Sequence, residues 1–157
     1  MSNTLWRNGA VAGLIAGLVF LVVELVLVPT VGGGELWGPP RMMAAIALGD
    51  GVLPPPATFD AGVVAVAMIV HFALSVVLGI LFAMIAGRMT LSAPLMLIAG
   101  AVFGLVVYAV NFYGFTSAFP WFAMARNWIT VLAHAIFGLT LAWWLMRGRQ
   151  PMPVSAA

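Results

Sequence analysis

Four long apolar runs constrain what this chain can fold into. They cover approximately residues 8–29, 61–86, 93–115 and 128–146. Each run has about the 20 residues that a helix needs to cross the hydrocarbon core of a bilayer. Because lipid cannot satisfy exposed backbone groups, segments that span a membrane in this way must be helical. The sequence therefore predicts an all-α integral membrane protein, a four-helix bundle that forms a single transmembrane domain over residues 1–157.

The composition excludes several functional classes. Apolar residues make up 64% of the chain and charged residues only 6%, whereas a soluble domain has about a quarter charged residues. The net charge of +2 comes from arginine without any lysine, and no basic patch or motif for binding nucleic acid is formed. Cysteine is absent, which excludes disulfides, iron–sulfur clusters and thiol catalysis. We therefore expect the lipid bilayer, and no nucleic acid, as a partner of this chain.

The arginines predict the topology because they divide unequally between the two sides of the membrane. One side has Arg7, Arg88, Arg147 and Arg149, and the other side has Arg41 and Arg126. The positive-inside rule then places both termini in the cytoplasm. The two outer arginines are expected to contact lipid headgroups or the acidic side chains of the outer loops.

The first outer loop, residues 30–60, contains a segment with the features of a short helix. Pro39 and Pro40 precede the largely apolar residues 41–48, and Gly49 follows them, which suits the start and the end of a helix. We predict an interfacial helix that lies over the outer end of the bundle. The second outer loop, residues 114–127, is rich in aromatic side chains and is also predicted to be interfacial. Membrane anchoring is the preferred interpretation of both loops, and a lid over a cavity is the alternative.

Isolated polar side chains interrupt the apolar runs and share helical faces with small residues. In the first run, Gly9, Gly13 and Gly17 lie on the same face as Glu24. Glycine at this spacing lets helix backbones approach closely, and polar side chains in spans usually face the bundle interior. At a rise of about 1.5 Å per residue, the polar residues fall between the midplane and the outer surface. The sequence therefore predicts a binding or translocation pocket lined by Glu24, His71, Ser75, Tyr108, Asn111 and His134.

The first and third runs also share a short motif, Gly-Ala-Val-x-Gly-Leu, at residues 9–14 and 100–105. Each run is followed by an outer loop and then by a helix with a single histidine. This pattern predicts two hairpins related by a pseudo-twofold axis along the membrane normal. A chance match in an apolar composition is the alternative.

Glu24 is the strongest functional candidate among these residues. A carboxylate inside a span is unfavourable unless it is protonated, paired or hydrated, so Glu24 can carry a proton or bind a cation. A neutral acid that hydrogen-bonds a neighbouring helix is the alternative. Together with Glu24, His71 and His134 have the residue types of a non-haem iron site, and two histidines on separate spans are also compatible with haem b. Hydrogen bonding between helices is the alternative for each histidine.

Three functions are therefore open. The first is binding or translocation of a proton, a cation or a small solute in the pocket. The second is a redox protein that holds haem or a metal ion through His71 and His134. The third is a non-catalytic subunit of a larger membrane complex, and the glycine stripe of the first run could equally pack a homo-oligomer. No nucleophile with a base, no phosphate loop and no HExxH zinc motif appears, which argues against an enzyme.

Four stretches, at residues 37–46, 52–60, 111–115 and 119–128, resemble a group of small bacterial four-helix inner-membrane proteins. The resemblance covers most of the chain and implies that the protein lies in the bacterial inner membrane. It supplies no catalytic residues. Some members of the group carry a sodium:proline symporter label, but this chain is far shorter than a symporter and lacks inverted repeats with broken helices.

Overall fold

The computed structural model describes residues 3–53 and 55–148, which fold entirely without strands. Four helices are long and apolar enough to cross a membrane, and they form the expected all-α bundle. Their bounds are α1 (Asn3–Thr30), α3 (Ala61–Ala86), α4 (Ala93–Ala109) and α5 (Trp128–Arg147). A π-helical turn, η2 (Val110–Gly114), continues α4, so the third span reaches the predicted length with irregular geometry. Arg149 lies outside the described residues.

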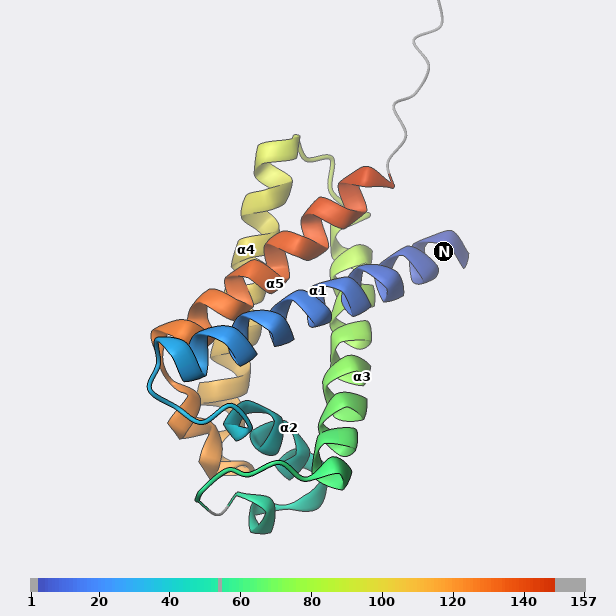
Figure 1. Cartoon of the computed structure of the whole chain (residues 1–157). Helices are drawn as coiled ribbons and strands as arrows, with labels where there is room; N and C mark the ends of the chain where they lie inside the picture. Colours follow the sequence, from blue (N-terminus) through green and yellow to red (C-terminus); the bar gives the residue numbers. More distant parts are fainter. Residues whose placement is uncertain (1–2, 54, 149–157) are drawn as a thin grey trace, which may run out of the picture.

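The two central helices of the bundle are α1 and α5 (Figure 1). They pack against each other, α3 packs on α1 and α4 packs on α5, whereas α3 and α4 make few contacts. The first outer loop forms α2 (Gly38–Leu48) and a short turn, η1 (Asp50–Val52). We call the end of the bundle that carries α2 the outer end, following the predicted topology, and the end where α1 begins the inner end.

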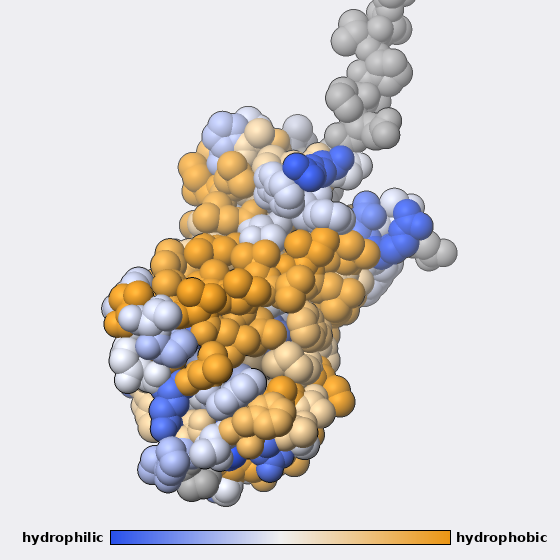
Figure 2. All heavy atoms as spheres, in the orientation of Figure 1, coloured by the Kyte–Doolittle hydropathy of each residue, from blue (hydrophilic) through white to orange (hydrophobic). Residues whose placement is uncertain are grey.

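An apolar surface surrounds the bundle, as a lipid environment requires. Figure 2 shows a broad apolar band across the middle of one face and polar atoms toward its ends. On α1 the outward residues are spaced by four, so they form one stripe along the helix. Each is at least 44% exposed: Leu14, Leu18, Val22 and Val26.

Glycine residues set the close approach of the paired helices. A Cβ atom at Gly13 of α1 would overlap the carbonyl group of Ser75 in α3, and one at Gly104 of α4 would overlap the carbonyl group of His134 in α5. The helix backbones therefore touch directly, as glycine at four-residue spacing permits. The predicted inward direction of these glycines is confirmed. The stripe on α1 therefore packs against α3 within the chain, and a homo-oligomer stays a prediction.

Both helix pairs repeat one contact pattern. In each pair, the two glycines of the shared motif meet a glycine of the second helix and the residue four positions before it, which are Gly79 and Ser75 on α3 and Gly138 and His134 on α5. The overall arrangement does not follow the predicted pseudo-twofold, because that axis would make the α1–α5 and α3–α4 contacts equivalent. Of these two pairs, α1 and α5 pack closely, whereas α3 and α4 do not.

The short helix predicted in the first outer loop is present as α2. Pro39 and Pro40 occupy its first turn, and Gly49 follows it with a φ of 82°, a backbone conformation that favours glycine. Ala44 and Ala45 of α2 are at most 1% exposed, and the helix packs on α3. This helix is therefore docked onto the outer end of the bundle and does more than anchor the loop in the interface.

The outer arginines hold the loops in place instead of pairing with acidic side chains. Arg41 donates from Nε to the carbonyl oxygen of Thr58 at 2.9 Å. Arg126 donates to the carbonyl oxygen of Phe112 and to the hydroxyl of Thr116, both at 2.7 Å. Loop carbonyl groups that no helix satisfies attract these guanidinium groups, which the sequence could not reveal.

Asn127 caps α5, as Oδ1 accepts hydrogen bonds from the backbone of Ile129 at 3.0 Å and of Thr130 at 3.1 Å. We expect Asn127→Ala to lower the free energy of unfolding by about 1 kcal/mol, the usual effect of removing such a cap. Ser92 precedes α4 without a side-chain cap bond, so Ser92→Ala is the matched control. Thermal unfolding in detergent, followed by circular dichroism, measures both. Equal effects of the two substitutions would contradict the capping role.

Candidate functional site

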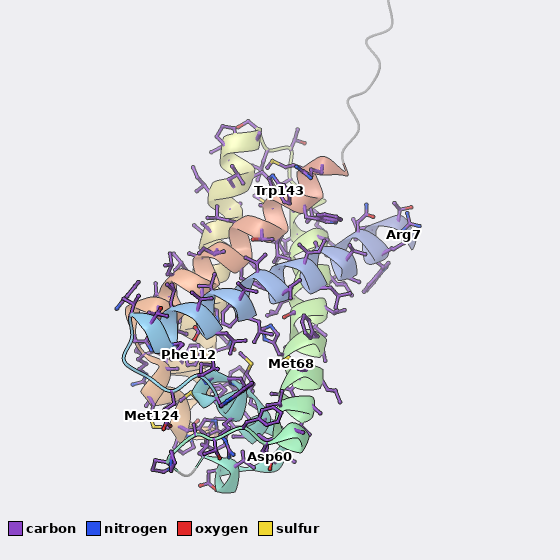
Figure 3. The ribbon with its side chains drawn as sticks, viewed as in Figure 1. Arg7, Asp60, Met68, Phe112, Met124 and Trp143 are labelled. Atoms are coloured by element: carbon purple, nitrogen blue, oxygen red, sulfur yellow. The ribbon has the colours of Figure 1, made fainter. Side chains whose placement is uncertain are left out.

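A cavity of about 130 Å³ lies in the outer half of the bundle. Side chains from all five α-helices line it, together with the 3-10 segment η4 (Pro120–Ala125) of the second outer loop. Figure 3 shows the side chains of this end, with Phe112 and Asp60 labelled. The α2 residues on the cavity wall are Pro39, Met42, Met43 and Ile46. Because α2 and η4 cover the outer end of the cavity, the structure favours the lid interpretation of both loops.

Most of the predicted pocket residues converge on this cavity. Its wall includes Glu24, His71, Ser75, Asn111 and His134. These residues come from four separate helical segments, so their meeting depends on the packing and confirms the predicted inward direction of the polar stripes.

Tyr108 is the exception, and its predicted place in the pocket is wrong. Tyr108 does not line the cavity, and its ring packs beside the ring of His134 with the centroids 5.6 Å apart. The prediction assumed a regular α-helix that puts Tyr108 and Asn111 on one face. Val107 and Asn111, which are four positions apart, line the cavity instead. Tyr108 is turned about 100° from Val107 around the helix, so it lies off the inward face.

Glu24 is the most unusual group in the wall. Its side chain is 5% exposed, and its Oε1 atom is buried without any hydrogen-bond partner. The side chain of Thr130 lies within hydrogen-bonding reach of the same carboxyl group. A buried acceptor that lacks a partner destabilises a protein by about 1–3 kcal/mol. Glu24 is also a residue of the cavity wall, so a partner for its carboxyl group can come from the cavity.

The two histidines are oriented by backbone carbonyl groups. His71 Nε2 lies 2.8 Å from the carbonyl oxygen of Gly17, and His134 Nδ1 lies 2.8 Å from that of Thr130. Since a carbonyl oxygen only accepts, each of these nitrogen atoms is the donor. In a neutral imidazole the other ring nitrogen is then an acceptor. Together with the carboxyl group of Glu24, the site offers hydrogen-bond acceptors to whatever occupies the cavity.

The geometry does not fit haem or a three-residue metal site. The ring of Phe20 packs on both imidazoles, with its centroid 5.5 Å from that of His71 and 4.9 Å from that of His134, so it occupies space beside both histidines that a ligated haem would need. The cavity of about 130 Å³ is also smaller than the sites of about 300 Å³ or more that hold drug-sized ligands, so it is too small for haem. Glu24, His71 and His134 do not form a metal-binding group, and no other three His, Cys, Asp or Glu side chains do so within the described residues.

Several residues of the cavity wall were not among the predicted pocket residues. Phe20 and Thr130 line the cavity, and each lies four residues before a predicted pocket residue, Glu24 or His134, on the same helical face. That spacing was the available signal for both residues. The contribution of α2 had no such signal, because it depends on how the loop folds back.

No protein family model, curated protein or solved structure matches this chain. The site therefore has to be interpreted from its own residues. The resemblance to small bacterial inner-membrane proteins stays a prediction.

Proposed function

We propose that this protein lies in the bacterial inner membrane with both termini in the cytoplasm, and that its cavity binds a small molecule through a hydrogen-bond donor group. The observation that carries the proposal is the carboxyl group of Glu24, a residue of the cavity wall whose Oε1 atom is buried without a hydrogen-bond partner. Free acceptors on His71 and His134 point to the same ligand chemistry. An ammonium group suits the site best, because it also supplies the charge that a buried carboxylate requires.

The rest of the wall describes the body of the ligand. Most lining side chains are aliphatic or aromatic, with a few polar groups among them, as in sites where polar groups fix the orientation of an apolar ligand. The volume of about 130 Å³ is close to the roughly 150 Å³ of an apolar cavity that admits benzene. We therefore expect a compact apolar group with an amine attached.

The packing of the inner half favours binding over passage through the bundle. Phe82, Met96 and Leu141 are less than 2% exposed there, and they fill the space below the cavity. A solute or a proton that crossed to the inner end would require these side chains and the glycine contacts to move. Binding at the outer end requires no such movement. A non-catalytic subunit remains a second candidate, but it leaves the unpartnered oxygen of Glu24 without a role.

Titration calorimetry of the detergent-purified protein with benzylamine tests the proposal. We expect Glu24→Gln to weaken benzylamine binding by at least about tenfold, because it removes the negative charge while keeping the shape of the side chain. A tenfold loss of affinity corresponds to about 1.4 kcal/mol. Asp50→Asn is the matched control, since it removes an exposed carboxylate that is not on the cavity wall.

Benzoate has the same ring with an acceptor in place of the donor, and we expect it to bind more weakly than benzylamine. Equal affinity of the unsubstituted protein and Glu24→Gln for benzylamine would reject the proposal. Tighter binding of benzoate would reject it as well, because the site would then supply donors.

A further inference from the structure

Leu74 of α3 differs from the other residues that line the cavity. It is 48% exposed, whereas every other lining residue is buried or half-buried. Leu74 lies in the middle part of a membrane span, so the surface that it shares with the outside is a lipid-facing surface. A side chain that belongs both to the wall and to the lipid-facing surface marks the place where the cavity opens.

The opening lies where α3 and α4 do not pack. Toward the inner end, Phe82 of α3 and Phe103 of α4 close the space between the two helices, with ring centroids 5.0 Å apart. Elsewhere the two helices make few contacts, and Leu74 of α3 and Val107 of α4 both line the cavity. The two helices therefore diverge at the level of the cavity and leave its side toward the bilayer open.

The other sides of the cavity are covered. The hydrogen bond from His71 to the carbonyl oxygen of Gly17 joins α3 to α1 at this level. The close backbone contact between Gly104 and His134 joins α4 to α5. At the outer end, α2 and the buried Phe122 of η4 lie over the cavity. The side between α3 and α4 is thus the least obstructed route to the site.

We infer that the cavity opens sideways into the bilayer between α3 and α4, and that its ligand is a single-chain amphiphile with an ammonium head and a hydrocarbon tail. The head reaches Glu24, and the tail passes Leu74 into the lipid. The cavity holds only about 130 Å³, so most of a long tail must remain outside it. Exposed apolar side chains on the helical faces beside the opening, Leu81 on α3 and Val110 at the start of η2, provide a surface for that tail. This inference rests on the proposed function and adds the ligand class and its route.

A series of n-alkylamines tests the inference in vesicles of phosphatidylcholine that contain the protein. Binding is measured against protein-free vesicles, so that each affinity refers to the amine already dissolved in the membrane. We expect butylamine, octylamine and dodecylamine to bind with affinities within about threefold of one another, because the part of the tail outside the cavity stays in the lipid. A tenfold difference in affinity would correspond to about 1.4 kcal/mol. A drop of more than about tenfold as the chain outgrows the cavity would overturn the sideways opening.

Substitution at the opening provides the matched pair of variants. Leu74→Phe narrows the opening, and we expect it to weaken dodecylamine binding by at least about fivefold, or about 1 kcal/mol. Ile69→Phe adds the same bulk to α3 at a residue that is 70% exposed and is not on the cavity wall, and it should leave the affinity unchanged. Equal effects of the two variants would contradict the route.

Photocrosslinking locates the tail directly. Dodecylamine with a diazirine at the end of its chain should label the lipid-facing sides of α3 and α4, and excess unlabelled dodecylamine should suppress that labelling. Suppressible labelling confined to α2 or η4 would show that the ligand arrives from the aqueous side and would overturn the inference.

Two further results separate the inference from the proposed function. If benzylamine binds but dodecylamine does not, the sideways route fails while the proposed function stands. If neither amine binds, both fail. Vesicles of phosphatidylethanolamine test whether a lipid headgroup is the ligand instead. We expect unchanged affinity for dodecylamine in them, and a loss of more than about tenfold would show competition by the lipid and overturn the single-chain assignment.

Discussion

Gly138→Ala is expected to destabilise the bundle by about 2 kcal/mol or more, the upper part of the usual range for overpacking. The added Cβ atom would overlap the carbonyl group of Gly100 and crowd the backbone nitrogen of Gly104. Backbone atoms cannot rotate away as the end of a flexible side chain can, so α4 and α5 must separate to make room. The measurement is thermal unfolding in detergent followed by circular dichroism, together with the yield of monodisperse protein in size-exclusion chromatography.

Gly51→Ala is the control for this prediction. Gly51 lies in η1 of the first outer loop, and a Cβ atom there would meet nothing within 4 Å. We expect the unfolding free energy of this variant to change by no more than about 0.5 kcal/mol, as for surface substitutions in general. If Gly138→Ala proved equally harmless, the direct backbone contact between α4 and α5 would be wrong, and with it the position of His134 on the cavity wall.

The sequence predicted the elements that short-range rules determine. Run length and hydropathy located the spans, because the thickness of the bilayer leaves few alternatives. Pro39, Pro40 and Gly49 located α2 through the backbone angles that these residues prefer. The glycine stripes and the polar residues indicated the inward faces, since both signals follow from the same helical period.

The sequence did not predict what depends on contacts between distant segments. The π-helical turn at Val110–Gly114 has no period of its own in the sequence. The sequence also did not show that Val107, and not Tyr108, lies on the cavity wall. The contact of Phe20 with both His71 and His134 follows from the crossing of α1, α3 and α5. That crossing also decides that the acceptors meet in a small cavity and leave no room for haem.

Glu24→Met is expected to raise the stability of the protein and to abolish amine binding. Methionine is close to glutamate in size and flexibility, so it can fill the same space. The substitution removes a buried oxygen atom that has no hydrogen-bond partner. Removing such an atom should raise the free energy of unfolding by about 1–3 kcal/mol. Thermal unfolding measures the gain in stability, and calorimetry with benzylamine measures the loss of binding in the same preparation.

A purely structural role for Glu24 makes the opposite prediction. If its carboxyl group served mainly to join α1 to Thr130 of α5, the substitution would lower stability by about 1 kcal/mol, the usual contribution of a hydrogen bond between membrane helices. Glu35→Met is the matched control, because the carboxylate of Glu35 accepts a hydrogen bond from the backbone of Ala57 in the outer loop. The same exchange there removes a satisfied group and should not stabilise the protein. A gain in stability at Glu24 alone, together with lost binding, would indicate that this carboxyl group is kept for its ligand at the expense of the fold.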